Sequence, residues 1–474
     1  MNARTTALAC PGLTAFALRL INKLSSTSAT STGNLVFSPL SIYAALALTS
    51  AGARGVTLQQ LLALLGAKSR KDLAKIVRGL AEQALADRTL GGEPRVSFAC
   101  GMWHDETRKL RPSLREAAAQ FYKAETGAVN FHEKPGEAVK QINAWAAAAT
   151  NNLIDSVLTE QQVSTETDVI VANTVYFKAM WDSPFSGHNT EDDKFYRLDG
   201  TAFDVAFMRA ARSSTSPATK VPDERDGLRG LVQRIASSPN FIRAHLPTSL
   251  VSVGDFKLPR FKLTFSADIS GILQRLGLHM AEADMSNMME DDGTGRPLAL
   301  NGVVHKAVIE VNEDGTEAAA VTADLMCGCG PPPKTPPVLV DFVADHPFAF
   351  FVIEEESGAI VFAGNVLEPS RSIPGENLRC RESVRRAPNF VGRRPEHPWT
   401  LAVFVANRNV APTHAAVTPR TLPGDPVIQR ELPTPPLDLD AITRPPLLHN
   451  GASYKPGLTL IYPRTWPNQR PDSI

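Results

Sequence analysis

The chain has 474 residues, of which 43% are hydrophobic, and its 49 basic side chains balance 49 acidic ones. This length suits two or three domains or one large domain with extensions, and the apolar content excludes wholesale disorder. Zero net charge gives no overall field for nucleic acid or an anionic membrane, so we expect neither as a partner, and five scattered cysteines favour a reduced compartment over a disulfide framework.

The N-terminal segment 1–21 predicts an amphipathic helix. It lacks the compact apolar run of a signal peptide, and no stretch of the chain approaches the roughly 18 consecutive apolar residues of a membrane-spanning helix. We therefore expect a cytoplasmic or nucleocytoplasmic protein, with non-classical export to the extracellular space left open.

Three further segments carry helix signals. Ser38–Ala51 opens with a capping serine followed by a proline at the first helical position. Thr57–Leu65 opens with the Thr-x-x-Gln spacing of a capping box and stops at Gly66. Gly136–Asn151 is rich in alanine, the best helix former.

Strand signals follow from residue 169 onward, as runs of β-branched and aromatic residues. The first run has apolar side chains on both alternating faces, which predicts a strand buried on both sides. Because helices come early and strands late, we predict an α+β fold. The predicted strands are Val169–Phe177, Phe256–Phe265, Val303–Val311, Val338–Val343, Phe348–Glu354 and Ala359–Val366.

Composition changes near Pro369. The last 104 residues hold 17 of the 36 prolines, with 14 basic and 8 acidic side chains, and their one strand-like run is Leu401–Ala406. Repeated proline removes backbone donors and forbids a continuous helix or central strand. We therefore predict that residues 371–474 are a disordered Pro/Arg-rich C-terminal extension, either without function or serving as a basic interaction arm.

Motifs for the common enzyme chemistries are absent. The sequence contains no GxxxxGK[ST], GxSxG, HExxH or CxxC pattern. His104 and Asp105 form an isolated pair, which is more typical of a structural position than of catalysis. Cys327 and Cys329 lack the further ligands that a zinc site needs. We expect no catalytic residue, no metal and no cofactor.

One segment is physically unusual: 313-EDGTEAAAVTA-323, which follows a predicted strand and precedes a Pro-rich stretch. A structureless loop of about 20 residues is uncommon in a compact domain and is usually functional or disordered. In an extended strand Thr316, Ala318, Ala320 and Thr322 would share one face, and Glu317 would point the other way. The segment is either a loop that can become a strand or a plain flexible linker, and its residues alone leave both open.

Four longer segments settle that choice by resemblance. They are 34-NLVFSPLSIYAALALTSAGARGVT-57, 170-IVANTVYFKAMWDSPF-185, 305-HKAVIEVNEDGTEAAAVTA-323 and 345-DHPFAFFVIEEESGAIVFAGNVLEP-369. Together, and in this order, they resemble the serpins (serine protease inhibitors), most closely the plant cereal-type Z serpins, over roughly residues 10–369.

The resemblance implies a serpin domain over residues 1–370. Its fold has a large mixed and antiparallel sheet A, sheets B and C, about eight to nine helices, and an exposed reactive-centre loop at about 313–337. The implied activity is suicide inhibition of serine or papain-like cysteine proteases. A protease cleaves the loop, and the loop inserts into sheet A before the acyl-enzyme is hydrolysed. Such a protein is not an enzyme.

Functional residues are carried over by their positions in the four segments. The implied hinge of the loop comprises Glu313, Gly315, Thr316, Glu317, Ala318, Ala319 and Ala320. The implied shutter, beneath the strands that open, comprises Ser38, Ser41, Asn173 and His305. The implied breach, at the top of sheet A, comprises Trp181 and Arg260, with an ion pair from Arg260 to Glu313.

The reactive bond falls at Cys329–Gly330, to within a residue, for a loop of the usual length. No basic residue lies nearby, which disfavours trypsin-like targets with a pocket carboxylate. A small residue suits the shallow pocket of an elastase-like serine protease or a papain-like cysteine protease. We expect such a protease as the partner of a monomeric inhibitor.

Two departures from the family favour a non-inhibitory or defective serpin that acts as a storage or interaction protein. Asp324 continues the inward-facing alternation of the hinge, where an unpaired carboxylate would cost several kcal/mol. Near 211–226 a polar bridge without a strand-like run replaces three strands of sheet B. Ala349–Ile353 and Ile360–Val366 would then lack a neighbour and expose open backbone groups.

Overall fold

A computed structural model defines the fold. It describes residues 11–25, 33–85, 95–178, 181, 185–209, 215–221, 227–238, 240–245, 250–279, 283–291, 293, 298, 300–313, 340–354, 357–369, 399–405 and 459–463. Within these ranges the helices are α1 (Pro11–Ser25), α2 (Pro39–Gly52), α3 (Gly55–Leu65), α4 (Arg70–Gln83), α5 (Pro112–Phe121), α6 (Pro135–Ala149), α7 (Gly227–Ser237), α8 (Phe241–His245) and α9 (Ser270–Arg275).

Local sequence explains how α2 begins and how α3 ends. The Ser38 hydroxyl caps α2 by accepting a hydrogen bond from Ser41 N, and Pro39 occupies the first helical position. Helix α3 ends, as predicted, at Gly66, whose φ of 64° is the left-handed value that glycine tolerates. The predicted Thr57 cap is wrong: α3 starts at Gly55, and the Thr57 hydroxyl accepts a hydrogen bond from Asp284 N instead.

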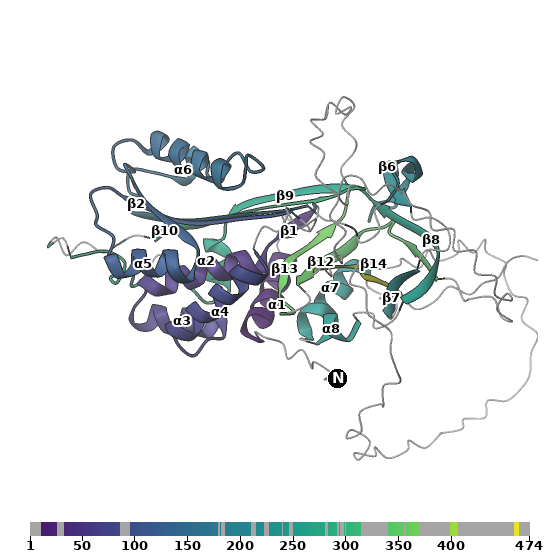
Figure 1. Cartoon of the computed structure of the whole chain (residues 1–474), viewed down its shortest axis with the longest axis horizontal. Helices are drawn as coiled ribbons and strands as arrows, with labels where there is room; N and C mark the ends of the chain where they lie inside the picture. Colours follow the sequence, from purple (N-terminus) through teal and green to yellow (C-terminus); the bar gives the residue numbers. More distant parts are fainter. Residues whose placement is uncertain are drawn as a thin grey trace, which may run out of the picture. The chain divides into compact units, whose positions relative to one another are not determined.

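Sheet A, the five-stranded sheet, has the strand order β3-β2-β4-β10-β9. Its central strands β4 and β10 are parallel neighbours, with Val169–Lys178 lying beside Leu300–Glu310. Helix α6 covers one face of the sheet, and α2 and α5 lie on the other (Figure 1). The bounds are β2 (Arg95–Asp105), β3 (Ala124–Val129), β4 (Val169–Lys178), β9 (Phe261–Asp268) and β10 (Leu300–Val311).

Both faces of sheet A are packed, which confirms that β4 is buried on both sides. Val169, Val171 and Val175 join the main core with α2, whereas Ile170 and Ala172 pack against α6 in a smaller core. Strand residues alternate between faces, so side chains on β4 either meet α2 or meet α6.

The second sheet joins the expected sheets B and C into one path. Its order is β1-β13-β12-β14-β15-β7-β8-β6-β5, with β11 beside β8. The bounds are β1 (Leu35–Phe37), β5 (Glu191–Tyr196), β6 (Ala202–Arg209), β7 (Thr215–Val221), β8 (Leu250–Pro259), β11 (Val340–Val343), β12 (Phe348–Glu354), β13 (Ile360–Val366), β14 (Trp399–Val405) and β15 (Thr459–Pro463).

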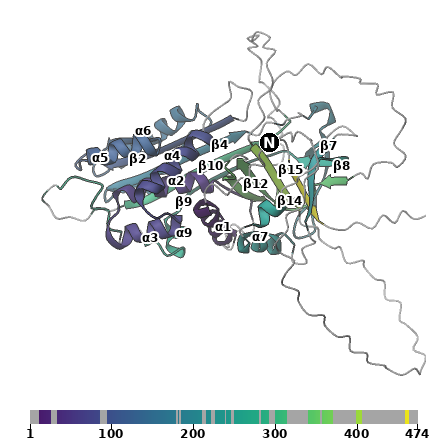
Figure 2. The same ribbon diagram turned by 60° about the horizontal axis from the view of Figure 1, so that its bottom comes forward.

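Strand β12 is not left without a neighbour, contrary to the prediction. Strand β14 pairs with it antiparallel along its whole length, from Phe348 opposite Val405 to Glu354 opposite Trp399. Strand β15 then pairs with β14 and with β7 (Figure 2). The prediction of disorder throughout residues 371–474 is therefore wrong for these two strands. The reason is physical: Trp399–Val405 is an apolar, β-branched run, and an open strand edge binds such a run through its free backbone groups.

Two other strand predictions need correction. The bridge 211–226, for which we predicted no strand-like run, contains strand β7. Its β-branched residues Thr215, Thr219 and Val221 are interrupted by Pro217, which sequence patterns count against a strand. The single strand predicted over Phe256–Phe265 is two strands, β8 and β9, which belong to different sheets and meet at Arg260. The Arg260 backbone N–H donates to Ala206 O of β6 at 3.0 Å, which extends the β6–β8 ladder up to the corner. Because the strand-like run continues through this corner between β8 and β9, the sequence pattern does not reveal where one strand ends and the next begins.

Within the described ranges, none of the helices combines the length and apolarity needed to cross a bilayer. In the same ranges, no group of three or more His, Cys, Asp or Glu side chains is arranged to hold a metal ion.

Candidate functional site

The candidate site is the seam between β4 and β10. The four residues of the implied shutter meet at this seam, and all four are completely buried. Asn173 on β4 lies directly opposite His305 on β10, and both side chains point toward α2, which Ser38 caps and whose first turn carries Ser41. The fold thus brings together residues that are far apart in sequence.

A chain of hydrogen bonds links the seam to α2. Ser38 N donates to His305 Nε2 at 3.1 Å, so Nε2 is the unprotonated nitrogen and Nδ1 carries the hydrogen. Nδ1 then donates to Asn173 Oδ1 at 2.6 Å, and Asn173 Nδ2 donates to Ser41 O at 2.7 Å. The Ser41 hydroxyl is buried and has no hydrogen-bond partner among the described residues. Such a group stands out, because buried polar atoms are usually paired.

Burial lowers the pKa of the His305 imidazole to about 3. No carboxylate contacts the ring among the described residues, and its aromatic neighbour is Phe265, at 6.2 Å between ring centroids. The imidazole therefore stays neutral at physiological pH, which is the state that the hydrogen-bond chain requires.

This burial predicts a pH dependence of stability. The folded pKa of His305 lies below the ordinary value of about 6.5, so the unfolded chain binds the proton more readily between pH 6.5 and pH 3. The free energy of unfolding should fall by about 2 kcal/mol from pH 7 to pH 5 through this group. Urea unfolding of the wild type and of His305→Gln at pH 5, 6 and 7 tests it. The variant should lose this part of the slope, and two parallel pH profiles would contradict the assignment.

The implied breach lies at one end of the seam, where β10 leads into the loop. Trp181 is buried, and its Nε1–H donates to Asn312 O at 2.6 Å. Its ring packs edge-on against Phe185 at 5.2 Å. Arg260 Nη1 lies 3.3 Å from both carboxylate oxygens of Glu313. The Arg260 side chain is 45% exposed, so solvent screens this pair and its contribution is small.

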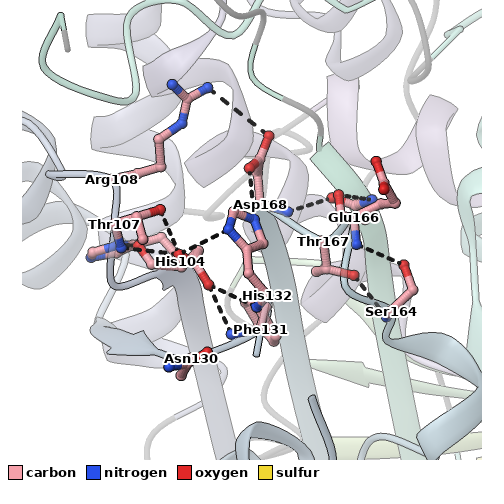
Figure 3. Close-up of polar contacts among 12 residues, drawn as sticks. His104, Thr107, Arg108, Asn130, Phe131, His132, Ser164, Glu166, Thr167 and Asp168 are labelled. Atoms are coloured by element: carbon pink, nitrogen blue, oxygen red, sulfur yellow. Dashed lines mark hydrogen bonds and ion pairs between the residues drawn. The ribbon is translucent and has the colours of Figure 1, made fainter. Parts of the chain in front are cut away.

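A second polar cluster, which the sequence analysis did not find, lies at the opposite end of the seam (Figure 3). The buried Asp105 carboxylate accepts hydrogen bonds from Thr107 N, Thr107 Oγ1, Phe131 N and His132 N. His132 lies between two carboxylates, with Nδ1 at 3.4 Å from Asp105 Oδ1 and Nε2 at 3.3 Å from Asp168 Oδ1. Arg108 Nη2 lies 4.0 Å from Asp168 Oδ2.

These contacts explain the ionisation of Asp105. Burial raises the pKa of the carboxyl, but hydrogen bonds from Thr107, His132 and Phe131 favour the ionised form and bring the pKa below its ordinary value. The pair His104–Asp105 is buried and hydrogen-bonded into the end of the sheet, as a structural pair would be. His132 and Asp168 belong to no sequence motif. They meet Asp105 only because the end of β2, the residues after β3 and the residue before β4 come together in the fold.

The remaining implied residues lie outside the described part of the chain. These are the hinge residues Gly315, Thr316, Glu317, Ala318, Ala319 and Ala320 and the reactive bond Cys329–Gly330. Glu313, the first hinge residue, is described, and it holds the position next to Arg260.

Comparisons with known proteins now identify the family. The model of the family described as Serpin (serine protease inhibitor) matches residues 11–220 and 212–369. The chain belongs to the serpin family of protease inhibitors. The match comes in two segments that overlap at 212–220, inside the polar bridge near 211–226, where the sequence departs from the family pattern.

Within the family, this chain is a plant serpin of the cereal Z type. It is 52% identical to putative serpin-Z5 of Oryza sativa subsp. japonica, over 76% of this chain and 90% of that protein. It is 39% identical to serpin-Z4 of Hordeum vulgare, over 75% of this chain and 95% of that protein.

Solved structures confirm the predicted serpin fold. Arabidopsis AtSerpin1 in its native stressed conformation matches with a TM-score of 0.69 and 31% identity, over 78% of this chain and all of that one. Uncleaved ovalbumin matches with a TM-score of 0.62 and 21% identity, over 76% of this chain and 99% of that one. At that identity the second likeness concerns the fold alone.

Proposed function

We propose that this chain inhibits its target protease by inserting the cleaved reactive-centre loop between β4 and β10. The observation that carries the proposal is the parallel pairing of these two strands at the foot of the loop. A chain that leaves β10 after Val311 and turns back runs antiparallel to both strands. One inserted strand therefore exchanges a parallel ladder for two antiparallel ladders, which are slightly more stable per residue.

The buried groups at the seam support the proposal. Separating β4 from β10 breaks the contact between Asn173 and His305, but each residue keeps a partner on α2, at Ser41 O and Ser38 N respectively. The Ser41 hydroxyl, which finds no partner within the described part of the chain, lies beside the same seam. An inserted strand that brings the Thr322 hydroxyl toward this level would offer it a partner. A network with two satisfied arrangements suits a sheet that opens.

Loop cleavage should raise the thermal stability strongly. Ten inserted residues, matching the ten residues of β4, would gain about 1 kcal/mol each in net hydrogen bonding, and the melting temperature would rise by on the order of 20 °C. The measurement is a thermal melt before and after limited cleavage within residues 324–337. An unchanged melting temperature would remove the inhibitory mechanism.

We further propose an elastase-like serine protease or a papain-like cysteine protease as the target. The support is the sequence around Cys329–Gly330, which offers a small side chain and no basic one. Incubation with one protease of each class, and with trypsin as the comparison, should give a complex stable to SDS only for a member of the first two classes.

The second candidate is a non-inhibitory serpin that serves as a storage or interaction protein. Asp324 favours it, because its carboxylate would have to be buried or protonated as insertion proceeds. This candidate predicts simple cleavage of the loop, with no stable complex and no gain in melting temperature. The thermal melt therefore discriminates between the two candidates.

A further inference from the structure

Asn301 bridges the two seam strands at the end opposite the loop. It lies at the start of β10, and its Oδ1 accepts a hydrogen bond from Asp168 N, directly before β4, at 2.9 Å. Its Nδ2 donates to Glu166 O at 3.3 Å. One side chain thus ties β10 to the loop that enters β4, through both of its polar ends. The strand ladder itself is irregular here, with a register shift between Leu300 and Gly302.

Of the two residues that Asn301 holds, Asp168 is itself fixed by the cluster around Asp105. Asp105 N donates to Asp168 O at 2.9 Å, which joins the end of β2 to the start of β4. The Asp168 carboxylate faces both the His132 imidazole and the Arg108 guanidinium (Figure 3). Asp168 is completely buried, so its position is set by these contacts and not by solvent. The Asn301 contact is therefore anchored on a rigid support on the β4 side.

Simple counting shows when an inserting strand reaches Asn301. If Asn312 and Gly315 close the turn after β10, antiparallel pairing places Thr322 opposite His305 and Met326 opposite Asn301. The first eight residues after the turn can enter without disturbing Asn301. The residues that follow, up to Met326, cannot enter until Asn301 releases the start of β4.

We propose that Asn301, positioned by Asp168 and His132, holds the far end of the seam closed and controls the completion of loop insertion. This inference rests on the function proposed above and names its regulation. Asn301 acts as a positioning residue, because it reaches neither the protease nor the reactive bond. Its contact delays the last step of insertion and leaves the entry of the hinge unaffected.

Two synthetic peptides test the inference without knowledge of the target protease. The long peptide copies residues 314–326 and reaches Asn301, whereas the short peptide copies residues 314–323 and ends before it. Incorporation of each fluorescent peptide into the full chain is followed by native electrophoresis over time. In Asn301→Ala the long peptide should enter roughly ten-fold faster than in the wild type, because two hydrogen bonds no longer resist opening. The short peptide should enter at the wild-type rate.

His132→Ala provides a second variant with an intermediate effect. It removes one support of Asp168, so the long peptide should enter about two- to three-fold faster, again with no change for the short one. Asn301 is exposed, and substitutions at such positions seldom prevent folding.

Three other outcomes of the uptake experiment would contradict the role proposed for Asn301. Equal acceleration of both peptides would mean that Asn301 stabilises the sheet in general and does not act at its far end. Uptake of both peptides at wild-type rates in both variants would overturn the inference and leave the proposed function standing. If the wild type and the variants take up neither peptide, the seam does not open and the proposed function fails as well.

Discussion

Replacing Val403 by Asp should prevent this chain from folding to a soluble product. Val403 lies in β14, is completely buried, and stands opposite Phe350 of β12, which is equally buried. An unpaired carboxylate at this position costs several kcal/mol, which is a large part of the 5–15 kcal/mol that stabilises a typical domain. We expect the soluble yield to fall to about a tenth of the wild-type yield or less.

A matched control separates this position from the chemical change itself. Val56 lies in the first turn of α3 and is 68% exposed. Val56→Asp makes the same substitution in solvent, near a helix N-terminus that favours negative charge, and should unfold at the wild-type urea concentration. Val403→Ala should give an intermediate loss of about 2 kcal/mol, because it removes buried methyl groups without adding charge.

The result bears on the role of the C-terminal extension. If Val403→Asp yields soluble protein with wild-type unfolding, then β14 does not support the sheet and β12 tolerates an open edge. If it aggregates, residues beyond 369, where the family match ends, have become part of the core. Strand β14 would then compensate for the strands that the bridge near 211–226 lacks.

Sequence patterns predicted the elements whose signals are local. Strand β12 was predicted with the bounds that the structure has, because it is a continuous apolar run between turn residues. Strand Leu401–Ala406 was also recognised as a run, but its partner was not, since β14 pairs with a strand that lies about fifty residues earlier in the chain. Pairing partners at such separations leave no trace in a single sequence.

The candidate site divides in the same way. Ser38, Asn173 and His305 were found because they stand inside family segments, and the structure adds the hydrogen bonds between them. Asn301 and His132 lie outside any motif, and their relation to Asp168 arises only when three strand ends meet. Their contacts depend on tertiary structure, so no local pattern could predict them.

Replacing Ala318 by Arg should abolish inhibition and convert the chain into a substrate. In an inserted strand the side chain of residue 318 faces inward, toward the surface of sheet A that carries Asn173 and packs on α2. That surface is completely buried. A guanidinium placed there without a partner costs several kcal/mol, so loop insertion would become slower than hydrolysis of the acyl-enzyme. The protease assay should show cleaved loop and free, active protease in place of a stable complex.

Glu317→Arg is the control that separates the effect of the inward position from the effect of a positive charge in the loop. Successive side chains of a strand alternate between faces, so residue 317 faces away from α2 and already carries a charge. Its replacement by Arg should leave the yield of stable complex within about two-fold of the wild-type yield. If both variants still form the complex, the inserted strand does not pass between β4 and β10. If both fail, the charge of the loop matters for protease recognition, and the inward position of residue 318 is not the cause.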